Sequence, residues 1–389
     1  FGKIEQAEKE LYTGGLKIYS TMDVGLQHKI EEIYSNFTEI LYGNTDNTNG
    51  PILISWSLDG NNNIVDENKN VVYFKQENIL DGDMNLIIEN GTFSLENNTL
   101  IINNRKLRPY KNHIDIVDYY NIDDKKNLVT HNMGSLSIGE DLFSVGENKK
   151  IVIKENFLNN NKDFYKVDEN NNLIIDSKYF YRSEDGIVQP QSATVIMDYR
   201  TGEIKALVGG RDIKGSKLLN RATSAKRQPG SSIKPVAVYL PALDNGFTAA
   251  SVIDDIPHYN QNGDLWPNNW NRKYTGLNSL RRSVEQSINV NSVKTLEAIG
   301  IDTSLEYLTR MGIIHPDHPE TDSFVSRSEN EANNDENLSA LGLGGMTNGL
   351  TPLELTAAYG SIANGGTYVE PIAFTKILDK DGNVLLENT

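Results

Sequence analysis

The spacing of apolar residues divides the chain into three parts. In the first, residues 1–48, the short run at 15–21 predicts a strand, and Asp23 follows at a position suited to a helix N-cap. Beyond it, apolar side chains recur at three- and four-residue steps, at Leu26, Ile30, Ile33, Phe37 and Ile40. This period predicts one helix with a single apolar stripe.

The second part, residues 49–188, is dense in Asn, Asp and Gly. Its short apolar runs lie at 52–54, 71–74, 86–88 and 151–153, and Asn-rich turns such as 61–63 and 170–172 separate them. Short strands between turn residues predict a β-rich accessory module or insertion. A poorly ordered low-complexity insert is the alternative, and the repeated apolar triplets argue against it. No set of residues in this part suggests chemistry.

The third part, residues 189–389, opens with two β-rich runs, 194–198 and 203–208, on either side of Tyr199-Arg200-Thr201-Gly202. This arrangement predicts a hairpin. From Ser231 onward, helical patterns dominate. Strands followed by a block of helices predict an α+β fold in which helices cover a sheet.

Composition limits the class of partner. The length of 389 residues suggests two or three domains. A net charge of −16 argues against nucleic acid, because phosphate contacts need clustered Lys and Arg. The absence of Cys excludes disulfides and thiolate chemistry. No apolar run approaches the roughly 20 residues of a membrane span. Since the chain opens at Phe1 without Met, we expect it to be a piece of a longer protein whose anchor would lie elsewhere.

The strongest candidate for chemistry is Ser231-Ser232-Ile233-Lys234, which precedes an apolar run at 236–243. If a helix opens near Ser231, Ser231 and Lys234 lie one turn apart on one face. A hydroxyl needs a base to become a nucleophile, and Lys is a base only if its pKa falls from about 10.4. Burial and nearby positive charge would both lower it. Pro241 is expected to kink or end the helix. Taken alone, S-x-x-K is weak evidence, because such a spacing arises by chance in long chains and is better explained by a capping Ser and a surface Lys.

The second candidate is Ser287-Ile288-Asn289, in a short loop between helical segments. A hydroxyl and an amide two residues apart can face one cleft. The hydroxyl can relay a proton between a base and a leaving amine, and the amide can hold a peptide bond of the substrate. Taken alone, S-x-N is better explained by a helix cap.

Together with their flanks, the two motifs resemble class A (bifunctional) penicillin-binding proteins, which share S-x-x-K, S-D-N and K-T-G signatures with class A β-lactamases. Residues 220–235 are similar to the family's nucleophile segment, and 267–270 with 274–276 to the stretch before its S-x-N loop. Further similar stretches lie at 11–27, 341–345, 350–355, 357–359 and 363–366. The resemblance covers about 1–40 and 189–389.

The sequence departs from the family pattern in three ways. Ile288 stands where the signature has Asp. No K-T-G follows Asn289, and we interpret this as truncation, or a second chain, rather than loss. No glycosyltransferase segment is present, so that activity is not assigned to these residues.

The resemblance implies a penicillin-binding, serine β-lactamase-like α+β fold and a D,D-transpeptidase that cross-links peptidoglycan stem peptides through an acyl-enzyme. The implied catalytic residues are Ser231, Lys234 and Ser287, and the candidate substrate-binding residues are Asn289, Trp270 and Tyr274. Trp270 and Tyr274 either line the cleft or belong to the core. The alternatives are a D,D-carboxypeptidase or β-lactamase-like hydrolase, and a penicillin-recognising sensor without turnover.

The resemblance also implies the setting. The expected partners are D-Ala-D-Ala stem peptides, β-lactams and cell-wall synthesis proteins, at the extracytoplasmic face of a bacterial membrane. No cofactor or metal is expected. His315 and His318 have H-x-x-H spacing, but Pro316 lies between them and favours a surface loop over zinc. Residues 342–345 predict a tight packing turn, and acidic pairs such as Asp254-Asp255 are expected to be solvated.

Overall fold

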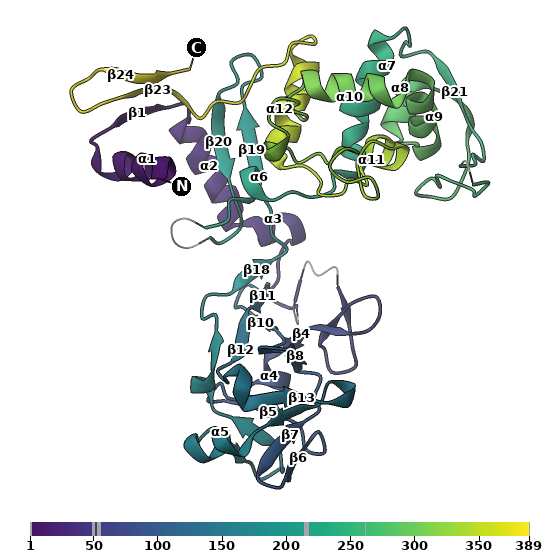
Figure 1. Ribbon diagram of the computed structural model, residues 1–389. Helices are drawn as coiled ribbons and strands as arrows, with labels where there is room; N and C mark the ends of the chain where they lie inside the picture. Colours follow the sequence, from purple (N-terminus) through teal and green to yellow (C-terminus); the bar gives the residue numbers. More distant parts are fainter. Residues whose placement is uncertain (1, 49–50, 53–55, 214–217, 261, 389) are drawn as a thin grey trace. The chain divides into compact units, whose positions relative to one another are not determined.

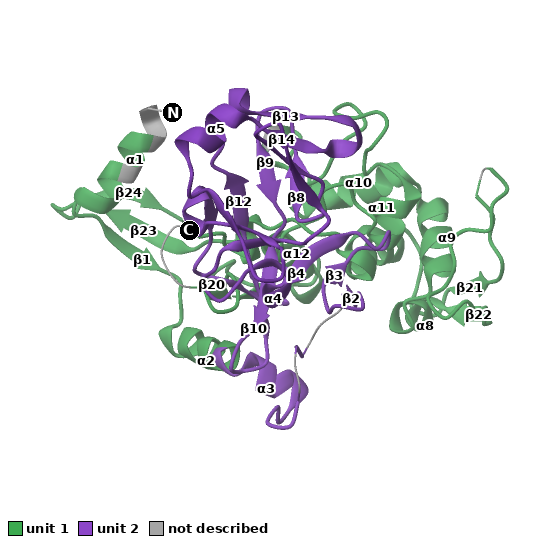
Figure 2. Cartoon of the chain, turned by 90° about the horizontal axis from the view of Figure 1, so that it is seen from below, with its two compact units in different colours: residues 1–34, 192–389 green, residues 35–191 purple. Residues whose placement is uncertain are grey.

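The computed structural model describes residues 2–48, 51–52, 56–213, 218–260 and 262–388. The chain forms two compact units, Phe1–Tyr34 with Ser192–Thr389 (unit 1) and Ser35–Gln191 (unit 2), coloured separately in Figure 2. The accessory module expected at 49–188 lies within unit 2, but this unit begins earlier, at Ser35. The reason is helix α3 (Phe37–Tyr42), where Thr38 Oγ1 donates to Asn127 Oδ1 of the same unit at 2.6 Å.

The first segment of the chain contains α1 (Gly2–Thr13), β1 (Lys17–Ser20) and α2 (Val24–Ser35). Asp23 caps α2 as predicted, because its Oδ1 accepts the backbone N–H of Leu26 at 2.9 Å. The single long helix predicted through Ile40 is wrong. Asn36, with φ −110° and ψ 18°, separates α2 from α3, and of the predicted stripe only Ile30 is buried.

The strands of unit 1 are antiparallel (Figure 1). Strands β19 (Thr194–Met197) and β20 (Ile204–Val208) form the predicted hairpin, with Thr194 opposite Val208. β1 pairs with β23 (Phe374–Leu378), which pairs with β24 (Val384–Glu387). β21 (Val252–Asp255) pairs with β22 (Gly276–Ser279).

A block of helices follows the hairpin, so unit 1 is an α+β domain, as the sequence predicts. These elements are α6 (Arg221–Ser224), the 3₁₀ turn η4 (Gly230–Ile233), the π-helix η5 (Pro235–Tyr239), α7 (Leu240–Asp244), α8 (Leu280–Glu285), α9 (Asn289–Ile299), α10 (Ile301–Arg310), the 3₁₀ turn η6 (Pro319–Thr321), α11 (Leu338–Leu343) and α12 (Pro352–Ala363). Val236, Ala237 and Val238 of η5 are fully buried in a core that also contains Leu296 and Leu341. Among the helices of the described residues, none combines the length and apolar character needed to cross a bilayer.

Unit 2 consists mainly of short strands around its own core, which includes Phe74, Ile88, Ile102 and Ile153. The predicted runs at 71–74, 86–88 and 151–153 form β4 (Val71–Lys75), β5 (Leu86–Ile88) and β14 (Ile151–Ile153). Of the run at 52–54, Ile52 bridges to Asn127, and the other two residues lie outside the described part of the chain.

The strands of unit 2 form four sheets, ordered β18-β11-β10-β4-β3-β2, β17-β12-β9-β8, β13-β14-β7-β6 and β15-β16-β5. Their bounds are β2 (Ser57–Leu58), β3 (Ile64–Val65), β6 (Phe93–Glu96), β7 (Thr99–Ile102), β8 (Leu107–Pro109), β9 (Ile114–Ile116), β10 (Tyr119–Ile122), β11 (Leu128–His131), β12 (Met133–Leu136), β13 (Phe143–Val145), β15 (Tyr165–Val167), β16 (Leu173–Ile175), β17 (Phe180–Arg182) and β18 (Ile187–Gln189), with short helices α4 (Gln76–Ile79) and α5 (Glu155–Asn160) and 3₁₀ turns η1 (Glu140–Leu142), η2 (Glu147–Lys149) and η3 (Ser177–Tyr179).

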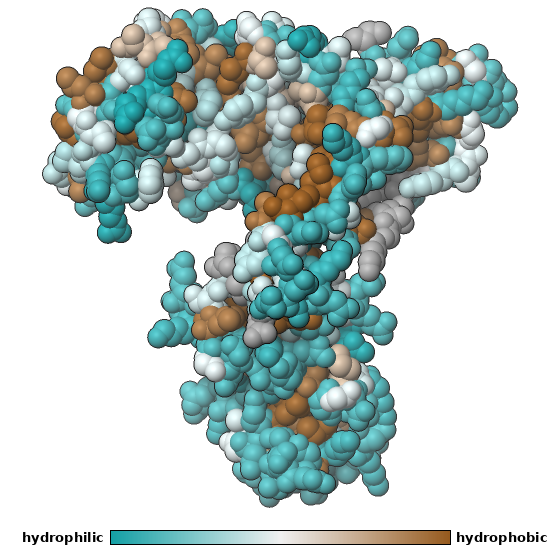
Figure 3. Space-filling view, turned by 180° about the vertical axis from the view of Figure 1, so that it is seen from behind, coloured by the Kyte–Doolittle hydropathy of each residue, from teal (hydrophilic) through white to brown (hydrophobic). Residues whose placement is uncertain are grey.

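The Asn-rich turns share one hydrogen-bonding pattern. Asp59 Oδ1 accepts the backbone N–H groups of Asn61 (2.9 Å) and Asn63 (2.8 Å), and its Oδ2 accepts Asn63 Nδ2 at 3.0 Å. The Asp and the Asn four residues later bond in the same way at 66–70, 81–85, 123–127, 168–172 and 379–383. The Asn and Asp content therefore reflects turn chemistry, and the face of unit 2 in Figure 3 is mostly hydrophilic.

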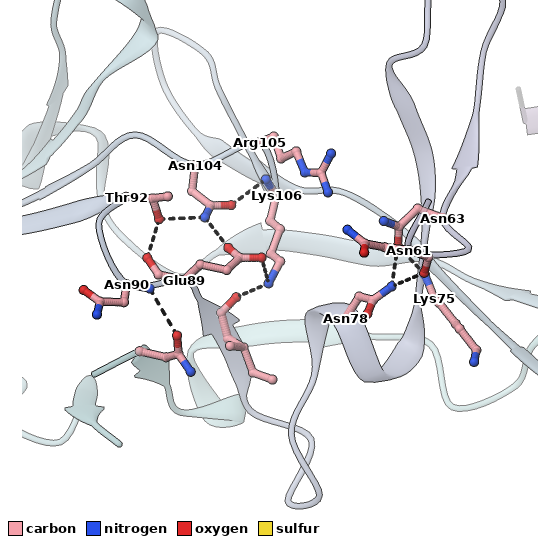
Figure 4. Close-up of polar contacts among 12 residues, drawn as sticks. Asn61, Asn63, Lys75, Asn78, Glu89, Asn90, Thr92, Asn104, Arg105 and Lys106 are labelled. Carbon is pink, nitrogen blue, oxygen red and sulfur yellow. Dashed lines mark hydrogen bonds and ion pairs between the residues drawn. The ribbon is translucent and has the colours of Figure 1, made fainter. Parts of the chain in front are cut away.

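Unit 2 also buries one lysine completely, at Lys106 (Figure 4). Its Nζ donates to the carbonyl oxygen of Ile87 at 2.7 Å and lies 2.8 Å from Glu89 Oε1, while Asn104 Nδ2 donates to Glu89 Oε2 and to Thr92 Oγ1. Burial lowers the pKa of Lys106. A buried charge is tolerated when it is paired, so this cluster fastens neighbouring segments together.

Candidate active site

The S-x-x-K motif begins in the one-turn 3₁₀ helix η4, and the backbone N–H of Lys234 donates to the carbonyl oxygen of Ser231. Side chains three residues apart eclipse each other in a 3₁₀ turn, so Ser231 and Lys234 point to the same side. Sequence reasoning predicted an ordinary helix here. Pro235 has no N–H for the α-helical bond to Ser231, and the chain instead takes a 3₁₀ turn followed by the π-helix η5.

Of the two effects predicted for Pro241, an end of the helix there is wrong, because the helical segment continues to Asp244 as α7. Pro241 cannot donate a backbone hydrogen bond to Ala237 four residues earlier. The hydroxyl of Ser304, on α10, donates to the carbonyl oxygen of Ala237 at 2.6 Å. A side chain from another helix thus satisfies the buried carbonyl.

The two residues of the S-x-x-K motif differ in exposure. Ser231 is exposed, and among the described residues its hydroxyl has no hydrogen-bond partner. Lys234 is buried, with 1% of its surface exposed. The hydroxyl is therefore open to a substrate, while the amine lies in the protein interior.

The ammonium of Lys234 joins the two motifs. Its Nζ donates to the carbonyl oxygen of Ser287 (3.0 Å), Ser287 Oγ (3.1 Å) and Asn289 Oδ1 (2.6 Å). Burial lowers its pKa to about 8. The sequence predicted burial and nearby positive charge as causes, and burial alone accounts for the shift. Within the described part of the chain, no carboxylate lies at ion-pair distance from this amine.

Ser287 lies in the tight turn between α8 and α9 with φ +50°. This left-handed conformation is uncommon for a residue other than Gly, and such backbone strain clusters at functional sites. The buried Ile288 follows it, and Asn289 opens α9. The turn thereby directs Ser287 Oγ and Asn289 Oδ1 to one lysine.

Sequence reasoning missed the pair that supports this turn, Asn269 and Asp255. Asp255 is 1% exposed, so its expected solvation is wrong. It is buried because it accepts hydrogen bonds from Asn269 Nδ2 (2.8 Å) and from the backbone N–H (2.8 Å) and hydroxyl (2.9 Å) of Thr275. The position of Asn269 in Pro267-Asn268-Asn269-Trp270 was the available signal.

The Gly-rich segment at 342–345 packs against the nucleophile segment. Gly344 has φ +79°, and a Cβ there would lie only 2.1 Å from the carbonyl oxygen of Gly230. Arg227 and Leu350 exchange backbone hydrogen bonds of 3.0 and 2.8 Å, and the hydroxyl of Tyr359 donates to the carbonyl oxygen of Ser232 at 2.8 Å. The predicted packing turn thus lies against Gly230, the residue before Ser231, while Leu350 and Tyr359 bond to Arg227 and Ser232 on either side of it.

The two aromatic candidates differ. Trp270 is 80% exposed, so the possibility that it belongs to the core is wrong. It lines a hollow next to Asn269 and Ile288, together with Asp255, Asn271, Lys273, Thr275, Arg282 and Gln286. Tyr274 is partly buried and lies outside that lining.

The H-x-x-H segment forms a local contact. His315 Nδ1 lies 2.5 Å from Asp322 Oδ1, and the side chain of His315 is exposed. Among the described residues, there is no group of three or more His, Cys, Asp or Glu side chains that could hold a metal ion.

Comparison with known proteins gives three kinds of match. The family described as "Penicillin binding protein transpeptidase domain" matches residues 192–387. Penicillin-binding protein 1A of Clostridium botulinum is 37% identical over 217 residues, which cover 53% of this chain and 24% of that protein. The protein of the same name from Pseudomonas aeruginosa is 36% identical over 216 residues, covering 53% and 24%. A crystal structure of penicillin-binding protein 1A from Haemophilus influenzae aligns with 100% of this chain and 49% of that one, at 19% identity and a TM-score of 0.49.

The chain spans about a quarter (24%) of the length of the curated relatives that it matches. The matched family region starts at residue 192, where the chain re-enters unit 1. It contains η4, the S-x-N turn and the Gly-rich segment, and it covers half of the chain. The resemblance in the third part of the sequence is thereby confirmed, and this chain belongs to the family of the penicillin-binding protein transpeptidase domain.

Proposed function

We propose that this chain carries the catalytic site of a peptidoglycan D,D-transpeptidase, with Ser231 as nucleophile. One observation supports this most strongly: the buried amine of Lys234, three residues after the exposed Ser231, donates to Ser287 and Asn289 of the S-x-N turn, and burial lowers its pKa to about 8. Family membership supports the same reaction. The substrate would be a stem peptide that ends in D-Ala-D-Ala.

In the first step, neutral Lys234 accepts the proton of Ser231, and Ser231 Oγ bonds to the carbonyl carbon of the penultimate D-Ala. The C–N bond to the terminal D-Ala then breaks. The proton passes from Lys234 through Ser287 Oγ to the leaving amine. The 3.1 Å contact between Lys234 Nζ and Ser287 Oγ supports this path. An amine of a second stem peptide attacks the ester, gives up its proton by the reverse path, and releases Ser231.

Asn289 is the proposed anchor of the substrate backbone. Its Oδ1 accepts from Lys234, and its Nδ2 donates to the carbonyl oxygen of Asn268 at 2.8 Å. An amide nitrogen carries two donors, which leaves one for a substrate carbonyl. Trp270 is proposed as a wall of the substrate site because its ring is exposed beside the turn. Tyr274 is also proposed as a substrate contact, and its position in the sequence is the only support for this.

The same proposal includes the setting. β-Lactams would acylate Ser231 as mimics of the donor, and the parent protein would act at the extracytoplasmic face of the membrane with other cell-wall synthesis proteins. These partners come from the family to which the chain belongs.

Acylation by penicillin tests the assignment. Intact-mass analysis and peptide mapping should show one drug adduct, on Ser231, both in this chain and in any longer form that includes a K-T-G segment. Ser231→Ala should abolish the adduct, and Ser232→Ala is the control that should retain it. A Ser231→Ala protein that still gains one drug mass would refute the assignment.

A second experiment measures the rate of D-Ala release with and without an acceptor amine. This comparison separates a transpeptidase from a hydrolase and from a sensor without turnover.

A further inference from the structure

We propose, on the basis of the function proposed above, that Asn269 is a positioning residue. Held by Asp255, it fixes the first residue of α9 so that the Asn289 side chain meets Lys234. Asn269 touches neither Ser231 nor Lys234 in the described structure, and it would act through Asn289.

The contacts of Asn269 link two parts of the chain. Its Oδ1 accepts the backbone N–H groups of Asn289 (2.9 Å) and Val290 (3.3 Å). Its Nδ2 donates to Asp255 Oδ1 (2.8 Å) and to the carbonyl oxygen of Lys273 (2.9 Å). The side chain thus uses both of its donors and holds the start of α9 with its oxygen.

The start of α9 depends on this contact. The first N–H groups of a helix have no partner within the helix, and a capping side chain usually supplies one. Ile288, the residue at the N-cap position, makes no side-chain cap. Asn269, twenty residues earlier in the chain, therefore takes the place of a local cap.

Asp255 orients the amide of Asn269. A carboxylate accepts hydrogen bonds and donates none, so Asp255 selects the amide orientation in which Nδ2 faces it and Oδ1 faces α9. Asp255 is fixed in turn by Thr275, whose hydroxyl also accepts a bond from Asn278 Nδ2 at 2.8 Å. Asn269 and Asp255 are 6% and 1% exposed.

The consequence for the site is geometric. Asn268 and Asn269 together hold the side chain and the backbone of Asn289. A shift of α9 by a fraction of a turn would move Asn289 Oδ1 away from Lys234 Nζ, now 2.6 Å away. Misplacing a reacting or positioning group by about 1 Å can cost roughly a hundredfold in rate.

The test compares Asn269→Ala with Asn85→Ala. Asn85 is buried in unit 2 and makes similar contacts, donating to Asp81 Oδ2 (3.1 Å) and accepting the backbone N–H of Ser177 (3.0 Å). The second-order rate of penicillin acylation at Ser231 should fall about ten- to hundredfold in Asn269→Ala and stay within about twofold in Asn85→Ala. The two variants should lower the melting temperature by similar amounts, Asn269→Ala that of unit 1 and Asn85→Ala that of unit 2.

A pH profile separates positioning from a general loss of stability. The groups facing Lys234 Nζ are the two oxygens of Ser287 and Asn289 Oδ1. Loss of one acceptor disfavours the ammonium, so the pH at which acylation is half-maximal should move down in Asn269→Ala. An unchanged midpoint would contradict the proposal.

Exchanging the two side chains provides a rescue. Asn269→Asp alone places two carboxylates together and should acylate slowly. In Asn269→Asp/Asp255→Asn, the new Asp can still accept from α9 and the new Asn can donate to it, with the bond to Lys273 lost. Acylation should recover several-fold over either single variant, and no recovery would contradict the paired role.

If Asn269→Ala acylates like the unmodified protein, the positioning role is wrong and the proposed function stands. If the unmodified protein is not acylated, the proposed function fails first.

Discussion

At the scale of single residues, the buried amine of Lys234 has properties that the proposed role as a base requires. A lysine ammonium has three donors, and the three acceptors from Ser287 and Asn289 use all of them. With a pKa of about 8, about one tenth of the amine is neutral at pH 7. Deprotonation frees a lone pair that can accept the proton of Ser231.

The first prediction is a pH dependence. Penicillin acylation should rise with pH and level off above pH 8, because only the neutral amine of Lys234 can accept a proton and its pKa is about 8. Stopped-flow acylation rates from pH 6 to 10 measure this. A rate that is flat across pH 8 would exclude Lys234 as the base.

The stability of unit 1 supplies a control for this titration. The pKa of Lys234 in the folded state, about 8, lies below its ordinary value of 10.5. Between these two pH values, Lys234 is therefore protonated more fully in the unfolded chain than in the folded protein. The contribution of Lys234 to stability should therefore increase from about pH 8 to about pH 10.5. Thermal unfolding of the unmodified protein and of Lys234→Met across this range isolates that contribution.

The second prediction concerns charge without basicity. Lys234→Arg should be nearly as damaging to acylation as Lys234→Ala, since Arg stays protonated in proteins and cannot act as a base. Adduct formation measured by mass spectrometry compares the two variants. Acylation of Lys234→Arg within about tenfold of the unmodified protein, roughly 1.4 kcal/mol of barrier, would make Lys234 an electrostatic anchor instead.

The two short motifs, taken with the resemblance of their flanks to a known family, were enough to select Ser231, Lys234, Ser287 and Asn289 as candidates, although neither motif decides alone. They could not select Asp255, whose partner Asn269 is 14 residues away. The burial of that carboxylate depends on how β21 and the loop before β22 pack, which no local pattern records.

At the scale of elements, strands and turns were more predictable than helix type. The hairpin of β19 and β20 and the runs that form β4, β5 and β14 follow directly from apolar patterns. The change from 3₁₀ to π geometry around Pro235 does not follow from the apolar pattern. Nor does the break between helices at Asn36, because the apolar period continues across it. Backbone hydrogen bonds and tertiary contacts decide such details.

The third prediction concerns the Gly-rich segment. Gly344→Ala should destabilise unit 1 and reduce acylation at least about tenfold, because it adds a Cβ 2.1 Å from the backbone of Gly230 in a left-handed conformation. Gly365→Ala is the matched control: its φ is +63°, but nothing lies within 4 Å of an added Cβ. The control isolates backbone strain, about 1 kcal/mol.

Thermal unfolding and penicillin acylation of the two glycine variants check this. Equal behaviour of Gly344→Ala and Gly365→Ala would show that the backbone conformation matters and the contact with the nucleophile segment does not.

At the scale of the whole molecule, each unit has its own hydrophobic core, one around Ile88 and Ile153 and the other around Val236 and Leu296. The residues discussed as catalytic all belong to unit 1. Within that unit, the Tyr34 hydroxyl lies 3.1 Å from Ser192 Oγ and 2.7 Å from Thr194 Oγ1. The two ends of unit 1 that flank unit 2 are therefore close together, and a short connection can join them.

The last prediction follows from this closeness. Replacing Ser35–Gln191 with a short Gly/Ser linker should give a folded protein whose Ser231 is acylated by penicillin within a few-fold of the unmodified chain. The boundaries matter, because α3 belongs with unit 2. A deletion that starts at residue 50 would leave Thr38 without Asn127 and serves as the comparison. Circular dichroism and thermal unfolding establish that each deletion is folded before acylation is measured. A well-folded deletion at 35–191 that can no longer be acylated would show that unit 2 shapes the active site, and its assignment as an accessory module would be wrong.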